Sequence, residues 1–218
     1  MEPGATRIKF CGLTRPQDAD HAVQAGAWAL GMILWRGSAR YCPPAVAAEI
    51  GATHRRHVQI AGVFVNPTLD EVVRAADEFS LSLLQFHGDE GPSFCAEAAR
   101  RTGARVIKAA RVRSGAEIQA LMPFHTDFHL LDTYRPDVPG GTGATFDWAL
   151  VRRHSRGGRP VPLILSGGLT ADNVTEAIAT VHPYAVDVSS GTETAPGIKD
   201  TARIDAFAAA VAETALVG

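Results

Sequence analysis

The chain of 218 residues has little cysteine and no long apolar run. Its three cysteines, Cys11, Cys42 and Cys95, lie far apart and form no Cys-x-x-Cys pair, which excludes a disulfide scaffold. The odd number of cysteines predicts reduced thiols and therefore a cytoplasmic protein. No stretch approaches the roughly 18 apolar residues of a membrane-spanning helix, and residues 1–15 lack the apolar run of a signal peptide. We expect no membrane partner.

An excess of charge of one sign is also missing. Lysine and arginine total 21 and aspartate and glutamate 23, so the net charge is −2. This balance excludes the basic footprint of a nucleic-acid-binding protein. Apolar residues make up 46% and charged residues 20%, as in soluble globular proteins, which excludes disorder. Because the composition has no break, we expect one domain over residues 1–218.

Short apolar, β-branched runs alternate with amphipathic stretches along the whole chain. The predicted strands are Ile8–Cys11, Leu30–Leu34, Gln59–Val65, Leu83–His87, Arg105–Ala109, Phe128–Asp132, Pro162–Ser166 and Ala185–Ser190. The predicted helices between them include Arg15–Gly26, Thr68–Phe79, Glu90–Thr102 and Thr170–Val181. Pro16 suits a first helical position, Gly26 and Gly103 suit helix ends, and Thr170 suits an N-cap. This alternation predicts parallel strands joined by crossover helices.

Eight such units predict an α/β fold, a single-domain (β/α)₈ barrel with the active site at the carboxyl ends of the strands. The alternative is a doubly wound open sheet, which usually has fewer strands. The longest spacing between strands predicts a long loop, Thr133–Thr145, after the sixth strand.

Glycines cluster where the last strands end. Ser166-Gly167-Gly168 follows the seventh strand, and Ser190-Gly191 follows the eighth. Gly141 and Gly143 lie in the loop after the sixth strand. Glycine lets backbone N–H groups approach an anion, and these loops are the usual phosphate site of the barrel. The sequence therefore predicts a small phosphorylated substrate, although glycines that only turn tight corners remain an alternative.

Two side chains flank this predicted phosphate site. In a closed ring, the seventh and eighth strands lie between the sixth and the first, so Asp132 and Cys11 stand on either side. A carboxylic acid and a thiolate in these positions can serve as general acid and general base. The alternatives are a loop cap for Asp132 and a small buried apolar residue for Cys11.

Lysines on strands raise the possibility of a Schiff-base lyase. Lys9 points into the barrel like Cys11 but lies deeper, so we expect a buried ion pair, with Asp187 as a candidate partner. Lys108 lies nearer the rim and remains a minor candidate for such an amine.

Other polar residues at the strand ends are candidates for substrate binding. Arg40 can hold a substrate carboxylate bidentately or be a solvated loop charge. His87, and Gln85 beside it, either line the pocket or make structural hydrogen bonds. No histidine or cysteine spacing predicts a metal site.

At these residues the sequence resembles the phosphoribosylanthranilate isomerase family of tryptophan biosynthesis. The matching segments are Lys9–Thr14, Gly37–Tyr41, Gly62–Asn66, Gln85–Gly88, Leu131-Asp132, Gly140–Gly143, Phe146–Trp148, Ser166–Leu169 and Asp187–Gly191. Phe10 and Phe86 depart from the family's more usual aliphatic residues. Their parity predicts that they face the helices, where they affect packing and leave the chemistry unchanged.

The resemblance implies a (β/α)₈ barrel that works without a cofactor. The implied reaction is the Amadori rearrangement of N-(5'-phosphoribosyl)anthranilate to 1-(2-carboxyphenylamino)-1-deoxyribulose 5-phosphate. The resemblance also implies the roles of three residues. Asp132 is the acid that protonates the ring oxygen and opens the ring, Cys11 is the base that removes the proton from C2, and Arg40 binds the anthranilate carboxylate. The rival functions are a histidine-pathway or dual-substrate isomerase, which uses two carboxylates, and a non-catalytic phosphate-binding barrel. We expect a monomer or homodimer.

Overall fold

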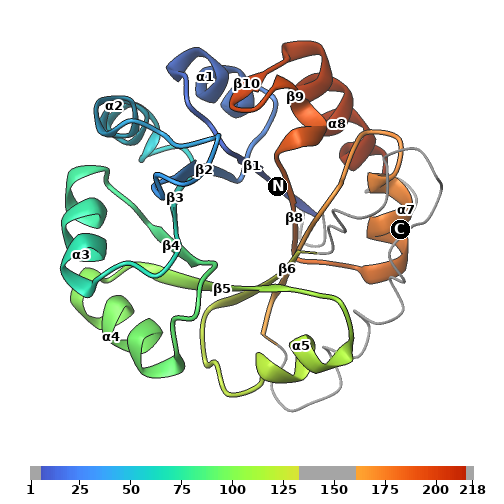
Figure 1. Ribbon diagram of the computed structural model, residues 1–218. Helices are drawn as coiled ribbons and strands as arrows, with labels where there is room; N and C mark the ends of the chain where they lie inside the picture. The colour runs from blue at the N-terminus through green and yellow to red at the C-terminus, as the bar shows by residue number, and fades with distance from the viewer. Residues whose placement is uncertain (1–5, 133–160, 215–218) are drawn as a thin grey trace.

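The computed structural model describes residues 6–132 and 161–214, which form a closed barrel of eight parallel strands (Figure 1). The strands pair in chain order, and the last returns to pair with the first. Helices surround the ring on its outside (Figure 1). The predicted (β/α)₈ barrel is confirmed, and the closing pair excludes the open sheet.

The elements follow one another as strand and helix. The barrel strands are β1 (Arg7–Cys11), β2 (Ala29–Ile33), β3 (Gln59–Phe64), β4 (Leu83–Phe86), β5 (Arg105–Arg111), β6 (Phe128–Asp132), β7 (Leu163–Ser166) and β8 (Ala185–Val188). The helices are α1 (Pro16–Gln24), α2 (Pro44–His54), α3 (Leu69–Glu78), α4 (Pro92–Thr102), α5 (Gly115–Ala120), α7 (Val174–Val181) and α8 (Thr201–Thr214). A small antiparallel hairpin, β9 (Glu193–Ala195) and β10 (Ile198–Lys199), follows β8.

Two predicted boundaries near the end of the chain are wrong. β8 ends at Val188 because Ser190–Thr192 forms a 3₁₀ turn. The helix predicted from Thr170 begins at Val174, and Asn173 precedes it as N-cap. The reason is local, since the Thr170 N–H donates to Asn173 Oδ1 at 2.9 Å and a turn forms before the helix.

The proline and the two glycines predicted at helix ends lie at or next to those ends. Pro16 begins α1, and its missing N–H costs nothing at that position. Gly26 and Gly103 follow α1 and α4 with φ of +88° and +71°, a conformation that glycine adopts without strain.

Side-chain parity separates the interior of the barrel from the layer beneath the helices. Inside, small and aliphatic residues such as Ala61, Ile107 and Ile164 form one cluster. Outside, the Phe10 ring packs edge-on against Phe207 of α8, and Phe86 packs in the same way against α4. The prediction that Phe10 and Phe86 face the helices is therefore confirmed.

Within residues 6–132 and 161–214, no helix combines the length and the apolar character that a bilayer crossing requires.

Candidate active site

The carboxyl ends of β6, β7 and β8 surround a pocket of about 290 Å³. Its lining residues are Arg40, Asp132, Ser166, Gly167, Gly168, Leu169, Asp187, Ser189 and Ser190. The predicted site residues Arg40, Asp132, Gly167, Gly168 and Ser190, which are far apart in the sequence, thus line one cavity. Gly141 and Gly143, predicted for the same site, lie outside the described residues, as does the predicted loop Thr133–Thr145.

Glycines shape the wall made by the loops after β7 and β8. Gly167 and Gly168 have φ of +102° and +64°, so the loop after β7 needs glycine to turn toward the pocket. A Cβ on Gly191 would lie 2.0 Å from the Leu169 carbonyl oxygen. Gly191 therefore lets the loop after β8 pack on the loop after β7, and it does not itself line the pocket.

Asp132 is the last residue of β6 and lines the pocket. It stands opposite Ser166 in the parallel pairing of β6 with β7, and its side chain is half-buried. The carboxyl group thus lies at the cavity wall, where an acid can reach a bound substrate.

Cys11 ends β1, the strand that follows β8 around the ring. The residue is buried and points inward above Lys9. Burial raises the pKa of its thiol above the ordinary value, while the Lys9 ammonium opposes that rise. The thiol form therefore dominates in the unliganded protein at neutral pH.

Lys9 forms the buried ion pair expected for it. Its Nζ lies 2.7 Å from Asp187 Oδ1, and the side chain is completely buried. The Ser166 hydroxyl donates to Asp187 Oδ2 at 3.2 Å. Asp187 lines the pocket, so this pair connects the barrel interior to the cavity.

Arg40 has a protein carboxylate as partner that the sequence reasoning missed. Its guanidinium donates to Glu193 over three contacts of 2.7–2.9 Å, with Nε and Nη2 as donors. Lys199 Nζ lies 3.1 Å from the same carboxylate. A Cβ on Gly12 would lie 2.8 Å from Arg40 Cδ, so Gly12 makes room for this side chain. The signal available in the sequence was an acidic residue shortly after the Ser-Ser-Gly turn.

Gln85 of β4, and His87 just after this strand, are not part of the cavity wall. Burial lowers the pKa of the half-buried His87 to about 4, although Asp187 opposes this. His87 is therefore neutral near pH 7. The side-chain oxygen of Gln85 is buried and accepts no hydrogen bond from the described residues.

Lys108 does not reach the pocket, contrary to its expected place near the rim. It stands beside Phe86 in the pairing of β4 with β5 and shares its outward direction. Its Nζ lies 2.9 Å from Glu90 and also donates to the Gly88 carbonyl oxygen. The Schiff-base alternative at Lys108 loses its geometric basis, because an amine must reach substrate to form an imine.

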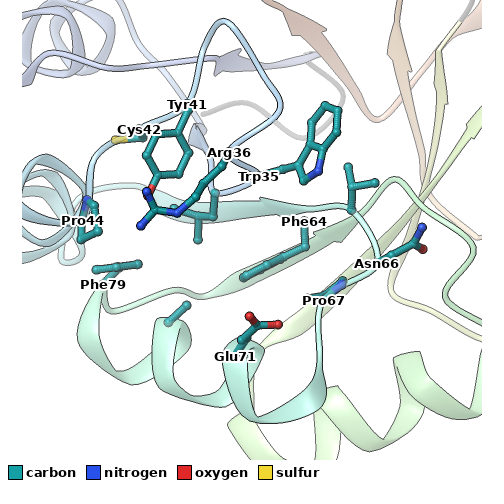
Figure 2. A pocket seen from close by; sticks show the side chains of 13 residues that line it. Trp35, Arg36, Tyr41, Cys42, Pro44, Phe64, Asn66, Pro67, Glu71 and Phe79 are labelled. Carbon is teal, nitrogen blue, oxygen red and sulfur yellow. The ribbon is translucent and has the colours of Figure 1, made fainter.

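A second pocket, of about 470 Å³, opens between the loops after β2 and β3 (Figure 2). Aromatic rings dominate its wall, with Arg36 above the Tyr41 ring at 5.2 Å and the exposed Trp35 at its edge. Its carboxylate, Glu71, accepts the hydrogen bonds of the Thr68 capping box. Residues predicted for the site line the Asp132 pocket and not this one, so the Asp132 pocket is the candidate active site. Among the described residues, no group of three or more histidine, cysteine or acidic side chains could hold a metal ion.

Comparison with known proteins agrees with this geometry. Residues 8–210 match the family model for N-(5'-phosphoribosyl)anthranilate (PRA) isomerase. A curated N-(5'-phosphoribosyl)anthranilate isomerase from Chromohalobacter salexigens is 49% identical over 211 residues, covering 96% of this chain and 95% of the relative.

Solved structures give the same result. The phosphoribosyl anthranilate isomerase of Thermotoga maritima has a TM-score of 0.86 and 37% identity, over 95% of this chain and 99% of that one. Another, solved in complex with reduced 1-(o-carboxyphenylamino)-1-deoxyribulose 5-phosphate, has a TM-score of 0.81 and 35% identity over the same shares. The chain therefore belongs to the N-(5'-phosphoribosyl)anthranilate isomerase family.

Proposed function

We propose that this member of the family isomerises N-(5'-phosphoribosyl)anthranilate to 1-(2-carboxyphenylamino)-1-deoxyribulose 5-phosphate, with Asp132 as general acid and Cys11 as general base. The observation that carries the proposal is the cavity in which Asp132 faces a glycine-rich loop, with Cys11 on the strand next to β8. A family member that binds the reduced form of this product supports the choice of substrate.

The reaction needs one proton delivered and one removed. Asp132 protonates the ring oxygen, the bond between C1 and that oxygen breaks, and the nitrogen lone pair gives a protonated imine. Cys11 as thiolate then removes the proton from C2, and the electron pair forms an enolamine that tautomerises to the ketose. Each transfer is of the kind that positioned side chains accelerate by about 10²–10⁴-fold.

The proposed phosphate site is the wall built by Gly167, Gly168 and Ser190. The positive φ of both glycines turns backbone N–H groups in a way that suits an anion. Gly141 and Gly143 complete this site in the proposal, and Gly191 acts through the packing of its loop on Leu169.

Arg40 is the proposed partner of the anthranilate carboxylate. Its side chain lines the pocket while Glu193 accepts from Nε and Nη2. Glu193 keeps the guanidinium plane in a fixed direction, which preserves the bidentate geometry that carboxylates prefer. His87 is proposed to contact the substrate in its neutral form.

We further propose that the protein works in the cytoplasm without a cofactor, as a monomer or homodimer. The three free cysteines suit a reducing compartment. Light scattering on the purified chain distinguishes the two oligomeric states.

The test generates the labile substrate in place, from anthranilate and phosphoribosyl pyrophosphate with a phosphoribosyltransferase, and follows its consumption with and without this protein. We expect rapid conversion to the ketose, and a parallel reaction with the histidine-pathway substrate should show no turnover. Consumption at the spontaneous rate, with binding of substrate retained, would support the non-catalytic barrel instead.

A further inference from the structure

Three buried side chains meet beneath the pocket where β1 lies beside β8. Lys9 and Asp187 are directly paired in the two strands, and their charged atoms are 2.7 Å apart. The Lys9 ammonium also lies close enough to the Cys11 sulfur, two residues further along β1, to act on the pKa of that thiol. One ammonium group therefore serves two partners, the carboxylate of Asp187 and the sulfur of Cys11.

The space around this cluster leaves little room for another arrangement. β2 presents Gly31 to it, and a Cβ there would lie 2.9 Å from Cys11 Sγ and 3.0 Å from Lys9 Nζ. Glycine at this position thus allows the sulfur and the ammonium to lie together against the neighbouring strand. On its other side Asp187 accepts from the Ser166 hydroxyl, which fixes the direction of the carboxylate.

Stability alone is a weak reason for such a pair. Replacing a buried ion pair by apolar residues of similar volume is often neutral or stabilising, because both charges lose their hydration. Most of the barrel interior is filled by apolar residues such as Ile107, Ile164 and Phe128. The charged pair stands where the interior approaches the cavity, which suggests a role in the chemistry.

We propose that Lys9 is a positioning residue that holds the Cys11 sulfur and stabilises its thiolate. The inference rests on the proposed function, in which Cys11 is the base. Lys9 acts through Cys11 and does not itself touch the substrate.

The charges around Cys11 come from three elements. Lys9 of β1 and, less strongly, Lys199 of β10 lower the pKa of the Cys11 thiol, whereas burial and Asp187 of β8 raise it. Burial alone would lower the pKa of Lys9, but Asp187 and Cys11 bring it above its ordinary value. Lys9 is therefore charged at neutral pH, and a thiolate that forms on Cys11 has a cation nearby.

The experiment uses a Cys42→Ala/Cys95→Ala parent, in which Cys11 is the one remaining thiol of the chain. Its ionisation is titrated by thiolate ultraviolet absorbance, with the corresponding Cys11→Ser protein subtracted. Lys9→Gln should raise the thiol pKa, and Asp187→Asn should lower it, because the carboxylate opposes ionisation. The acidic limb of kcat/KM should move in the same direction in each variant. Below the thiol pKa, Lys9→Gln should lower kcat/KM at least about tenfold with KM nearly unchanged.

Lys9→Gln leaves Asp187 buried without its cation and can unfold the chain. The Lys9→Gln/Asp187→Asn variant avoids this and should still raise the thiol pKa, because Lys9 acts on Cys11 more strongly than Asp187 does. An unchanged thiol pKa in this double variant, or shifts in the same direction in the two single variants, would overturn the inference. If the shifts occur as stated but Cys11→Ala keeps its turnover, the assignment of Cys11 as base fails separately.

Discussion

At the scale of single residues, the three cysteines are all buried but have different surroundings. Burial raises the pKa of Cys42 to about 12 and that of Cys95 to about 11. Burial also raises the pKa of the Cys11 thiol, but the nearby ammonium of Lys9 opposes that rise. A neighbouring cation is what separates a usable thiolate from an inert buried thiol.

Cys11→Ala should lower kcat at least about 10²-fold, the low end of the loss expected when a general base is removed. KM should change little, because the methyl group leaves the phosphate and carboxylate contacts in place. Steady-state kinetics with the substrate generated in place measures both constants. Cys42→Ala is the matched control and should keep its turnover, since Cys42 belongs to the outer core and does not line the pocket. Near-normal turnover of Cys11→Ala would remove this residue from the mechanism.

The Asp132→Asn variant distinguishes the contribution of the proposed acid to the pH profile from that of the proposed base. The acid must be protonated, so it sets the alkaline limb of kcat/KM, and the thiolate sets the acidic limb. In Asp132→Asn the alkaline limb should disappear and the acidic limb should remain, while kcat falls heavily because an amide supplies no proton. The pH profile, corrected for titration of the substrate phosphate, checks this. Substantial activity with an unchanged profile would refute the role of Asp132.

Arg40→Ala should weaken substrate binding by roughly 1.5–3 kcal/mol, as for a charge-assisted hydrogen bond. Arg40→Lys should recover only part of this, because an ammonium lacks the planar fork that also fits Glu193. Glu193→Gln serves as comparison and should raise KM less, since the guanidinium remains. Substrate binding is followed through KM and through the inhibition constant of the product. An equal KM for Arg40→Ala and the unmodified chain would show that Arg40 does not bind the substrate.

At the scale of elements, the site depends on the contact between the loops after β7 and β8. Gly191 lies so close to the Leu169 carbonyl group that no side chain fits between the two loops. The proposed phosphate site is the surface that these packed loops share.

Gly191→Ala should therefore displace one loop from the other, raise KM several-fold and destabilise the fold by about 1–3 kcal/mol, the usual cost of overpacking. Gly115→Ala is the matched control, because a Cβ at the start of α5 meets no atom within 4 Å. Urea midpoints and KM for the two variants provide the comparison. Equal behaviour of both variants would show that the loop contact does not shape the site.

At the scale of the whole molecule, His87 makes stability depend on pH. Burial lowers its pKa to about 4 in the folded protein, against 6.5 as the ordinary value. Below pH 6.5 the unfolded chain therefore binds a proton that the folded chain resists, and stability falls as pH drops from 6.5 toward 4. The loss from this residue reaches about 3 kcal/mol.

Urea unfolding at pH 7 and at pH 4.5 should show this loss, and His87→Gln should lose clearly less stability over the same interval. The matched control is His57→Gln at an exposed position, which should behave like the unmodified chain. An equal pH dependence for His87→Gln and the unmodified chain would contradict the assignment.

The sequence by itself determined the barrel and the main features of the candidate site. The alternation of strands and helices specifies eight parallel units, and closure of the ring then fixes which strands are neighbours. From this order alone, Asp132 and Cys11 must flank the glycine-rich loops. Strand parity likewise places Lys9 inside and Phe10 outside, because successive side chains of a strand point to opposite faces.

Only the tertiary structure decided which charged groups are partners. Arg40 and Glu193 are 153 positions apart, and their pairing depends on the path of two loops and on side-chain rotamers. Lys108 turns to Glu90 outside the barrel, and the low pKa of His87 follows from desolvation after the end of β4. Repeating patterns predict backbone geometry because they are local, whereas ion pairs and desolvation depend on contacts between residues that are remote in the chain.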